Sequence, residues 1–288
     1  MTRVVVIGAG VGGLGAACRL AGAGCDVLVL EAASEIGGKL GIARAEGHVF
    51  DTGPSLMTMP FTLRETLAAA GVELDDVLEL LPVEPICRYQ WHDGAELRTW
   101  TDEDRTAAAF DALEPGAGRA WRELLEQGRR TWDMSLPLFL SQPVGSPLDL
   151  ARRSGKPIDP RDIQAHRTLA QIGARRFRDP RLRQLVDRYA TYAGADPARA
   201  PGTLAVIPYT ETAFGAWHPA GGMHRIAEVL RDAIVLRGGA VRTGTPIRRV
   251  IVEDGTAVGV ELADASVERA DAVISNADAS RLYADLLP

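Results

Sequence analysis

Three glycines follow a short apolar run with a spacing that is typical of phosphate binding. Residues 4–7 are all apolar and β-branched, as expected for a strand buried on both faces. Gly8, Gly10 and Gly13 come next and fit the pattern G-x-G-x-x-G. In that pattern the first glycine permits a tight turn, the second lets a pyrophosphate approach the backbone, and the third lets the next helix pack closely. That helix, expected over residues 11–23, directs its positive N-terminal end at the phosphates.

An acidic residue completes the pattern. Residues 27–30 form a second apolar run, and Glu31 follows it, about 20 residues beyond the glycines. A carboxylate there suits the hydroxyls of an adenosine ribose and disfavours a 2′-phosphate, because two negative groups would meet at short range. Glycines alone often make only turns, but this turn follows a strand, opens a helix and precedes a strand that ends in an acid. The sequence therefore predicts a dinucleotide site.

The next residues bear on whether that dinucleotide carries nicotinamide or flavin. Gly37-Gly38-Lys39 comes soon after Glu31, and residues 50–54 read Phe-Asp-Thr-Gly-Pro. This combination resembles the flavin amine oxidase superfamily, in which the double glycine and the following basic residue lie along the flavin and its pyrophosphate. The resemblance implies FAD as the cofactor. A surface turn at 37–38 and a plain loop at 53–54 are the structural alternatives.

The order of elements predicts an α/β fold in which one domain interrupts another. Residues 1–75 read as strand, helix and strand, then a loop and a helix, and the alternation of strands and helices returns over 218–288. These two segments are assigned to a Rossmann-like FAD-binding domain. Residues 76–217 are assigned to a mainly helical α+β substrate (cap) domain with a hairpin at 86–100. In the C-terminal segment we expect a helix over 221–237 and strands over 240–243, 247–252, 257–262 and 272–275.

Composition and charge exclude several classes of protein. The chain has 288 residues, of which 46% are hydrophobic, so it can bury a sizeable core. Its net charge is −6 and it has no basic stripe, which argues against a nucleic-acid partner. The histidines and cysteines lack metal-ligand spacing, so no metal site is predicted. The scattered thiols and a strand that starts at residue 4, leaving no room for a signal peptide, predict a cytoplasmic protein.

Residues 132–150 allow two interpretations. The stretch is rich in leucine, has charges only at Asp133 and Asp149, and is followed by Arg152 and Arg153. One interpretation is a segment that rests on a bilayer surface with the arginines at the head groups, which makes a membrane surface a candidate partner and the protein peripherally membrane-associated. The other is a cap-domain segment packed on its own core. The prolines favour the second, because they interrupt a long amphipathic helix.

Segments of the second half carry a closer resemblance. Residues 188–194, 207–223 and 270–278, together with Asp51-Thr-Gly-Pro-Ser, are similar to the bacterial carotenoid desaturase family, which includes phytoene and hydroxycarotenoid desaturases. The resemblance covers essentially the whole chain and is loose over 101–180. It implies FAD-dependent desaturation of a long apolar polyene, in which a hydride leaves an allylic carbon for the flavin and a proton leaves the neighbouring carbon.

The same resemblance assigns candidate residues. The cofactor-binding residues so predicted are Gly8, Gly10, Val11, Gly12, Gly13, Glu31, Ala32, Gly37, Gly38, Lys39, Gly53, Pro54, Ser55, Ile247 and Asn276. The resemblance implies that the main chain near Ile247 contacts the adenine, and the segment Asn276-Ala277-Asp278 is alternatively only a strand-to-helix cap. The substrate residues are Tyr189, Tyr192, Trp217 and His218, although plain core aromatics are an equal alternative for the rings. Glu211 is the candidate base near the substrate tunnel, and pairing with a cap-domain arginine is its alternative.

The end of the chain departs from the family pattern. Family members continue well past this point and carry a second glycine-rich flavin segment, whereas this sequence stops at Pro288. We therefore expect the C-terminal part of the family fold to be missing. Two further functions stay open. One is a different flavin oxidoreductase of the superfamily, an amine oxidase or a polyene saturase, and the other is a non-catalytic relative that binds FAD or lipid. The oligomeric state is not indicated.

Overall fold

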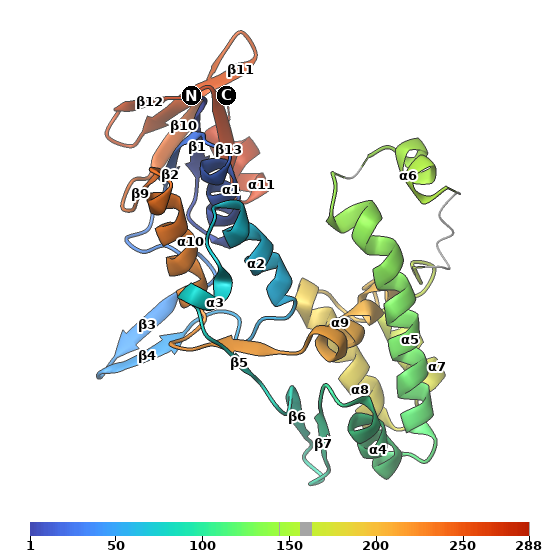
Figure 1. Cartoon of the computed structure of the whole chain (residues 1–288). Coiled ribbons are helices and arrows are strands. Elements are labelled where there is room, and N and C mark those ends of the chain that lie inside the picture. Colours follow the sequence, from blue (N-terminus) through green and yellow to red (C-terminus); the bar gives the residue numbers. More distant parts are fainter. Residues whose placement is uncertain (144, 156–162, 288) are drawn as a thin grey trace. The chain divides into compact units, whose positions relative to one another are not determined.

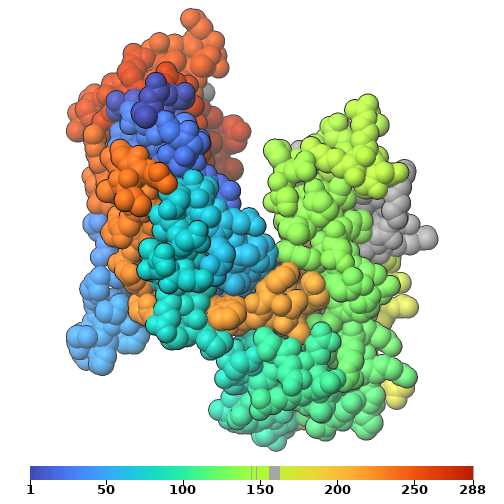
Figure 2. Space-filling view, in the orientation of Figure 1, coloured from blue at the N-terminus to red at the C-terminus, as the bar shows by residue number. Residues whose placement is uncertain are grey.

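The computed structural model describes residues 1–143, 145–155 and 163–287, which form two compact units (Figure 1). The first unit comprises Met1–Pro82 and Trp217–Pro288, and the second comprises Val83–Ala216. Segments from the two ends of the sequence interleave on the surface of the first unit, as the blue and orange to red atoms of Figure 2 show. The sequence placed the domain boundaries at 75/76 and 217/218, and that assignment to two domains stays a prediction.

A four-stranded parallel sheet forms the centre of the first unit. Its strands lie in the order β13-β1-β2-β9, and their bounds are Ala272–Ser275, Arg3–Ile7, Asp26–Leu30 and Ala240–Arg242. Val4 pairs with Val27 on one side and with Ala272 on the other, so β1 is a central strand. The two central strands, β1 and β2, are buried on both faces, which explains the unbroken apolar runs at 4–7 and 27–30.

Helices cover one face of this sheet. They are α1 (Val11–Gly22), α2 (Pro60–Ala69), α3 (Leu74–Val77) and α10 (Arg225–Leu236). Val4, Val6, Val27 and Val29 point to this side and share one buried core with residues of α1, α2 and α10. Figure 1 shows α1 and α10 over the sheet. The core fixes the N-terminus of α1 directly above the end of β1.

An antiparallel sheet covers the opposite face. It contains β10 (Ile247–Glu253), β11 (Thr256–Leu262) and β12 (Val267–Arg269), and the chain then closes with α11 (Ala279–Arg281) and η4 (Leu282–Leu286). Val5, Ile7, Leu28 and Leu30 pack here against residues such as Val260. Successive side chains of each parallel strand therefore enter two different cores, as the period of a strand requires.

Two small sheets complete the first unit. One is the hairpin of β3 (Ile42–Ala45) and β4 (His48–Asp51), and the other joins β5 (Leu80–Pro82) to β8 (Trp217–Pro219). Neither hairpin β3–β4 nor the pair β5–β8 was predicted from the sequence. The expected helix over 221–237 begins later, at Arg225, because Gly221 and Gly222 have φ of 89° and 102°, outside the helical range.

The second unit is mainly helical. Its hairpin consists of β6 (Cys87–Gln90) and β7 (Glu96–Thr99). The helices are α4 (Glu103–Leu113), α5 (Ala117–Ser135), η1 (Leu136–Leu140), α6 (Pro147–Ser154), α7 (Leu169–Arg176), α8 (Pro180–Arg188), η2 (Tyr189–Ala193), η3 (Gly202–Val206) and α9 (Ile207–Phe214). Phe110 forms the centre of the core, with its ring centroid 4.5 Å from that of Trp121 and 5.6 Å from that of Phe177.

The crossing of α1 and α2 gives a test of the first unit. A Cβ at Gly22 would lie 2.0 Å from the carbonyl oxygen of Ala69, whereas a Cβ at Gly15, in the same helix, would lie 3.9 Å from Thr66 Cγ2. We expect Gly22→Ala to lower the free energy of unfolding by about 1–3 kcal/mol, because the backbones must separate. Gly15→Ala is the control and should raise that free energy by about 0.5–1 kcal/mol, since it only removes backbone entropy. Urea denaturation measures both, and equal effects would contradict the close crossing.

Candidate functional site

The glycine turn lies between β1 and α1, and its glycines are explained by backbone conformation and close contacts. Gly8 has a φ of 93° and its N–H donates to the carbonyl of Leu30 at 2.8 Å. A Cβ at Gly13 would lie 2.1 Å from the carbonyl oxygen of Gly8. The third glycine is therefore required by the turn itself, because the first turn of α1 folds back on residue 8. The open N-terminus of α1 carries unpaired N–H groups that suit an anion.

Asn276 borders this turn from the adjacent strand. It follows β13, and its N–H donates to the carbonyl of Ile7 at 2.8 Å. A Cβ at Gly12 would lie 2.6 Å from Asn276 Oδ1, and one at Gly10 would lie 3.0 Å from Nδ2. The side-chain amide thus lies against the glycines at the N-terminus of α1, within reach of any group bound there. The strand-to-helix cap expected for the segment 276–278 is present and is formed by Asp278, which accepts from the N–H of Ser280, while Asn276 lies against the glycines.

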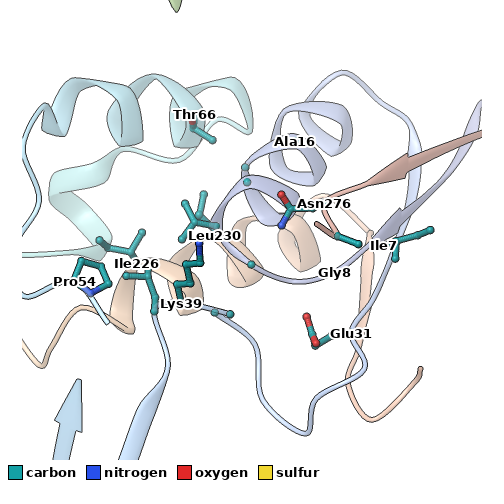
Figure 3. Close-up of a pocket in the computed structure, with 18 of the residues that line it drawn as sticks. Ile7, Gly8, Ala16, Glu31, Lys39, Pro54, Thr66, Ile226, Leu230 and Asn276 are labelled. Atoms are coloured by element: carbon teal, nitrogen blue, oxygen red, sulfur yellow. The ribbon is translucent and has the colours of Figure 1, made fainter. Parts of the chain in front are cut away.

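Glu31 links the turn to the end of β2. Its Oε2 accepts from the N–H of Ala9 at 2.7 Å, and its Oε1 accepts from the N–H of Ala33 at 2.9 Å. The sequence predicted a contact with a ribose but not these two bonds. A carboxylate has about four lone-pair positions, so both oxygens keep a further acceptor position. Glu31 therefore fixes the turn and still faces the cavity (Figure 3).

The double glycine forms a strap across the turn, which we define as residues 37–40. The N–H of Gly37 donates to the carbonyl of Ala9 at 2.8 Å, and a Cβ at Gly38 would lie 3.2 Å from the Cα of Gly10. Gly37 and Gly38 have φ of 104° and 58°, in the left-handed region that favours glycine. Close backbone contact thus explains the two glycines, and it places Lys39, which is exposed, at the rim of the turn.

These segments enclose a cavity of about 930 Å³ in the first unit. In Figure 3, Glu31, Lys39 and Asn276 reach into it from three different segments. The predicted cofactor residues that line it are Gly8, Gly10, Val11, Gly12, Glu31, Ala32, Gly37, Gly38, Lys39, Pro54, Ile247 and Asn276. Gly13, Gly53 and Ser55 are not among its lining residues. Gly53 is packed under the strap, since a Cβ there would lie 1.7 Å from the carbonyl oxygen of Lys39.

The lining of the cavity fits a dinucleotide. Its charged residues are Arg19, Glu31, Lys39 and Arg281, so cations outnumber anions in a chain whose net charge is −6. Gly8, Gly10 and Gly12 line the cavity next to the N-terminus of α1 and bring no side chain to it. A phosphate can approach the backbone only in such a place. Sequence reasoning missed Arg19 and Arg281, because neither belongs to the glycine motif or follows a strand end.

Two further residues that sequence reasoning missed hold this site together. Asp51 Oδ2 accepts from the N–H of Met223 at 3.0 Å, which ties β4 to the start of α10. Nδ1 of the buried His224 lies 2.6 Å from the carbonyl oxygen of Leu40 in the strap. The sequence suggested a satisfied surface or loop histidine for His224. The side chain is satisfied, but it is buried rather than on the surface.

The predicted substrate residues fall in both units. Trp217 and His218 belong to β8 of the first unit, where the N–H of Trp217 donates to the carbonyl of Met57 at 2.8 Å and His218 Nδ1 lies 3.0 Å from the carbonyl oxygen of Ser55. Tyr189 and Tyr192 belong to the second unit. Tyr189 is fully buried and Tyr192 is half exposed.

Glu211 forms the centre of a charged and aromatic cluster in the second unit. Its carboxylate is buried, and Arg188 Nη2 lies 3.4 Å from Oε1. The hydroxyl of Tyr189 donates to Oε2 at 3.3 Å, and that of Tyr192 donates to Oε1. Burial, and then the charge of Glu211, raise the pKa of Tyr189 and of Tyr192, so both phenols stay donors. Arg188 also lies over the ring of Tyr189, with Cζ 4.5 Å from its centre.

These contacts bear on the proposed base. The cation and two hydroxyls occupy the oxygens of Glu211, whereas a general base needs an acceptor position open to substrate. The arrangement favours the alternative that pairs Glu211 with a cap-domain arginine. Glu211 does not line the cavity of the first unit.

Glu31 generates the first prediction for this site. In Glu31→Gln one N–H of the turn faces an amide NH₂ group instead of an oxygen. We expect the free energy of unfolding to fall by about 1–3 kcal/mol, because a partly buried donor loses its acceptor. Glu35→Gln, which changes a nearby exposed carboxylate, is the matched control and should have little effect. If urea denaturation gives the same midpoint for Glu31→Gln and Glu35→Gln, the two hydrogen bonds from backbone N–H groups to Glu31 do not stabilise the fold.

Glu211 generates the second prediction. Glu211→Gln leaves the partly buried Arg188 without a counterion, and we expect the free energy of unfolding to fall by on the order of 3 kcal/mol. The double variant Arg188→Met/Glu211→Met should recover part of that loss, because it removes both charges together. A Glu211→Gln protein of unchanged stability that binds cofactor but has lost turnover would instead support the role of a base.

Solved structures share this fold. An oxidoreductase from Methanosarcina mazei superposes with a TM-score of 0.70 at 21% identity, covering 99% of this chain and 61% of that one. Putrescine oxidase in complex with putrescine gives a TM-score of 0.65 at 20% identity, covering 99% and 60%. At these identities the likeness establishes the fold alone. It confirms the predicted α/β architecture, in which a Rossmann-like domain is interrupted by a second, mainly helical one.

Curated relatives are closer in sequence. Hydroxyneurosporene desaturase of Cereibacter sphaeroides is 36% identical over 272 residues, covering 91% of this chain and 53% of the relative. The zeta-carotene-forming phytoene desaturase of Myxococcus xanthus is 33% identical over 271 residues, covering 92% and 51%. The chain spans about half the length of these relatives.

A family model gives the assignment. The model described as flavin containing amine oxidoreductase matches residues 11–287, a range that starts within the glycine turn and includes the strap, the second unit, β13 and Asn276. The match confirms FAD as the predicted flavin cofactor. This chain belongs to the flavin containing amine oxidoreductase family.

Proposed function

We propose that the cavity of the first unit binds FAD by its adenosine diphosphate half. The observation that carries the proposal is the close packing of the turn, the strap and Asn276, where a Cβ at Gly12 would lie 2.6 Å from Asn276 Oδ1 and one at Gly38 would lie 3.2 Å from the Cα of Gly10. The N-terminus of α1, Asn276 and the ammonium of Lys39 would hold the pyrophosphate. Glu31 and Ala32 would hold the ribose, and the main chain of Ile247 would contact the adenine. Gly13, Gly53 and Ser55 contribute by shaping the loops and not by lining the cavity.

We further propose desaturation of a long apolar polyene as the reaction. The relatives named above are desaturases of hydroxyneurosporene and phytoene, and this substrate class is carried over from their names. Bound FAD would supply the hydride acceptor. The chain itself would orient the polyene, keep water away and leave the adjacent proton to a base. Tyr189, Tyr192, Trp217 and His218 are the proposed substrate residues.

Association with a membrane surface is a further part of the proposal. No helix within the described ranges is both long enough and apolar enough to span a membrane. In the segment 132–150, Trp132 and Leu138 are buried in the second unit, whereas Leu140 and Leu148 are 61% and 59% exposed. The exposed leucines, with Arg152 and Arg153 nearby in sequence, suit a lipid surface from which an apolar polyene would be taken. The buried residues support the alternative of packing on the unit's own core.

The proposal is tested by adding FAD to the purified 288-residue chain, removing free FAD and recording the visible spectrum. We expect the absorption of a bound flavin. Anaerobic addition of phytoene-type polyenes in anionic vesicles should bleach it, and amines should not. Bleaching by amines alone would favour an amine oxidase, and reduction that requires a supplied reductant and saturates the polyene would favour a saturase.

A protein that stays colourless after this treatment would contradict the proposed site. That result would favour the non-catalytic relative and would leave polyene or lipid binding as its remaining activity.

A further inference from the structure

His224 contacts the strap but is not among the residues that line the cavity. His224 is buried, with an exposed fraction of 9%. Because a carbonyl oxygen can only accept, the ring nitrogen 2.6 Å from Leu40 O must be a protonated Nδ1 that donates. A Cβ at Gly37 would lie 3.0 Å from Nδ1 and 3.1 Å from Cε1, so the imidazole edge touches the backbone of the strap. Contact with the ring, together with the positive φ of residue 37, thus explains why this residue is a glycine.

The main chain of His224 provides a rigid base for this contact. Its carbonyl accepts from the N–H of Ala227 at 2.9 Å, which starts α10. The preceding residue, Met223, is held by Asp51 and is buried in the core of the first unit. The imidazole therefore projects from a helix start that packing has already fixed.

A continuous series of hydrogen bonds leads from His224 to the glycine turn. His224 Nδ1 donates to Leu40 O, the N–H of Leu40 donates to Gly37 O at 3.0 Å, and the N–H of Gly37 donates to Ala9 O at 2.8 Å. Lys39 lies in the sequence between Gly37 and Leu40, which take part in this series, and it lines the cavity, while its neighbour Leu40 is buried. The backbone of the strap therefore determines the position from which the exposed Lys39 side chain extends.

We propose that His224 is a positioning residue for the cofactor, which holds the strap 37–40 closed and so presents Lys39 to the phosphates. The inference rests on the proposed FAD site for its effect on affinity. Its local part, a strap held by the imidazole, does not depend on any ligand. These two parts are tested separately.

The local part is tested by hydrogen–deuterium exchange in the ligand-free chain. His224→Leu removes the donor, and the amides of Gly37 and Leu40 should exchange about tenfold faster or more, because the turn loses a buried bond. His224→Asn should restore protection, since Asn Nδ2 stands as many bonds from Cα as His Nδ1. Arg237→Leu is the matched control, because Arg237 Nε donates to the carbonyl of Ala70 at the other end of α10. Equal exchange in His224→Leu and Arg237→Leu would overturn the inference.

The effect on the cofactor is tested by FAD titration and a double-mutant cycle with Lys39→Met. His224→Leu should raise the Kd for FAD about tenfold, and His224→Asn and Arg237→Leu by less than about twofold. In the Lys39→Met background His224→Leu should change the Kd by less than about twofold, because the ammonium it positions is absent. The same tenfold factor in both backgrounds would overturn the role through Lys39. If the unaltered chain binds no FAD, the proposed function fails, and the exchange experiment alone decides the role of His224.

Discussion

Everything in the first unit depends on the close approach of three backbone segments at the end of β1. The turn at Gly8–Gly13, the strap at Gly37–Gly38 and the residue that follows β13 lie so close together that a Cβ at Gly12, Gly13 or Gly37 would lie between 2.1 and 2.8 Å from a neighbouring atom. Glycine avoids these clashes, and it lets a ligand approach the main chain at the start of α1. The ligand class follows from this constraint, because a phosphate is the group that benefits most from uncovered N–H donors at a helix start.

Burial on both faces of the parallel sheet makes that approach reproducible. Alternate residues of β1 and β2 enter a helical core on one side and the core of an antiparallel sheet on the other. The strand ends, and with them Gly8, Glu31 and Asn276, are fixed in mutual register. Asp51, Glu31 and His224 then connect the loops to this frame with hydrogen bonds to main-chain groups. Polar side chains here hold backbone in place, and the backbone forms most of the site.

The sequence predicted the parts of this arrangement that local rules determine. The runs at 4–7 and 27–30 are strands because their apolar residues fit a doubly buried sheet, the strand at 272–275 was predicted as well, and the glycine spacing marked the turn. The hairpin β3–β4 was missed because its residues are largely exposed and show no apolar alternation, and its turn uses Glu46-Gly47 and not the commoner Asn-Gly or Asp-Gly. Glu31 was predicted from its spacing to the glycines and Glu211 from the family resemblance, but the particular groups that bind Glu31, His224 and Glu211 were not identified. Their actual partners lie far away in the chain, or are backbone groups, and no spacing rule contains them.

Isothermal titration of the 288-residue chain with ADP tests the central claim most directly, because ADP contains only the half of the cofactor that the first unit is built to hold. We expect one ADP to bind per chain. Saturating FAD should abolish this binding, and neither polyene nor lipid should be required for it. Absence of ADP binding by the folded chain, or FAD binding that ADP does not displace, would contradict the assignment of the glycine turn, the strap and Asn276 to the adenosine diphosphate half.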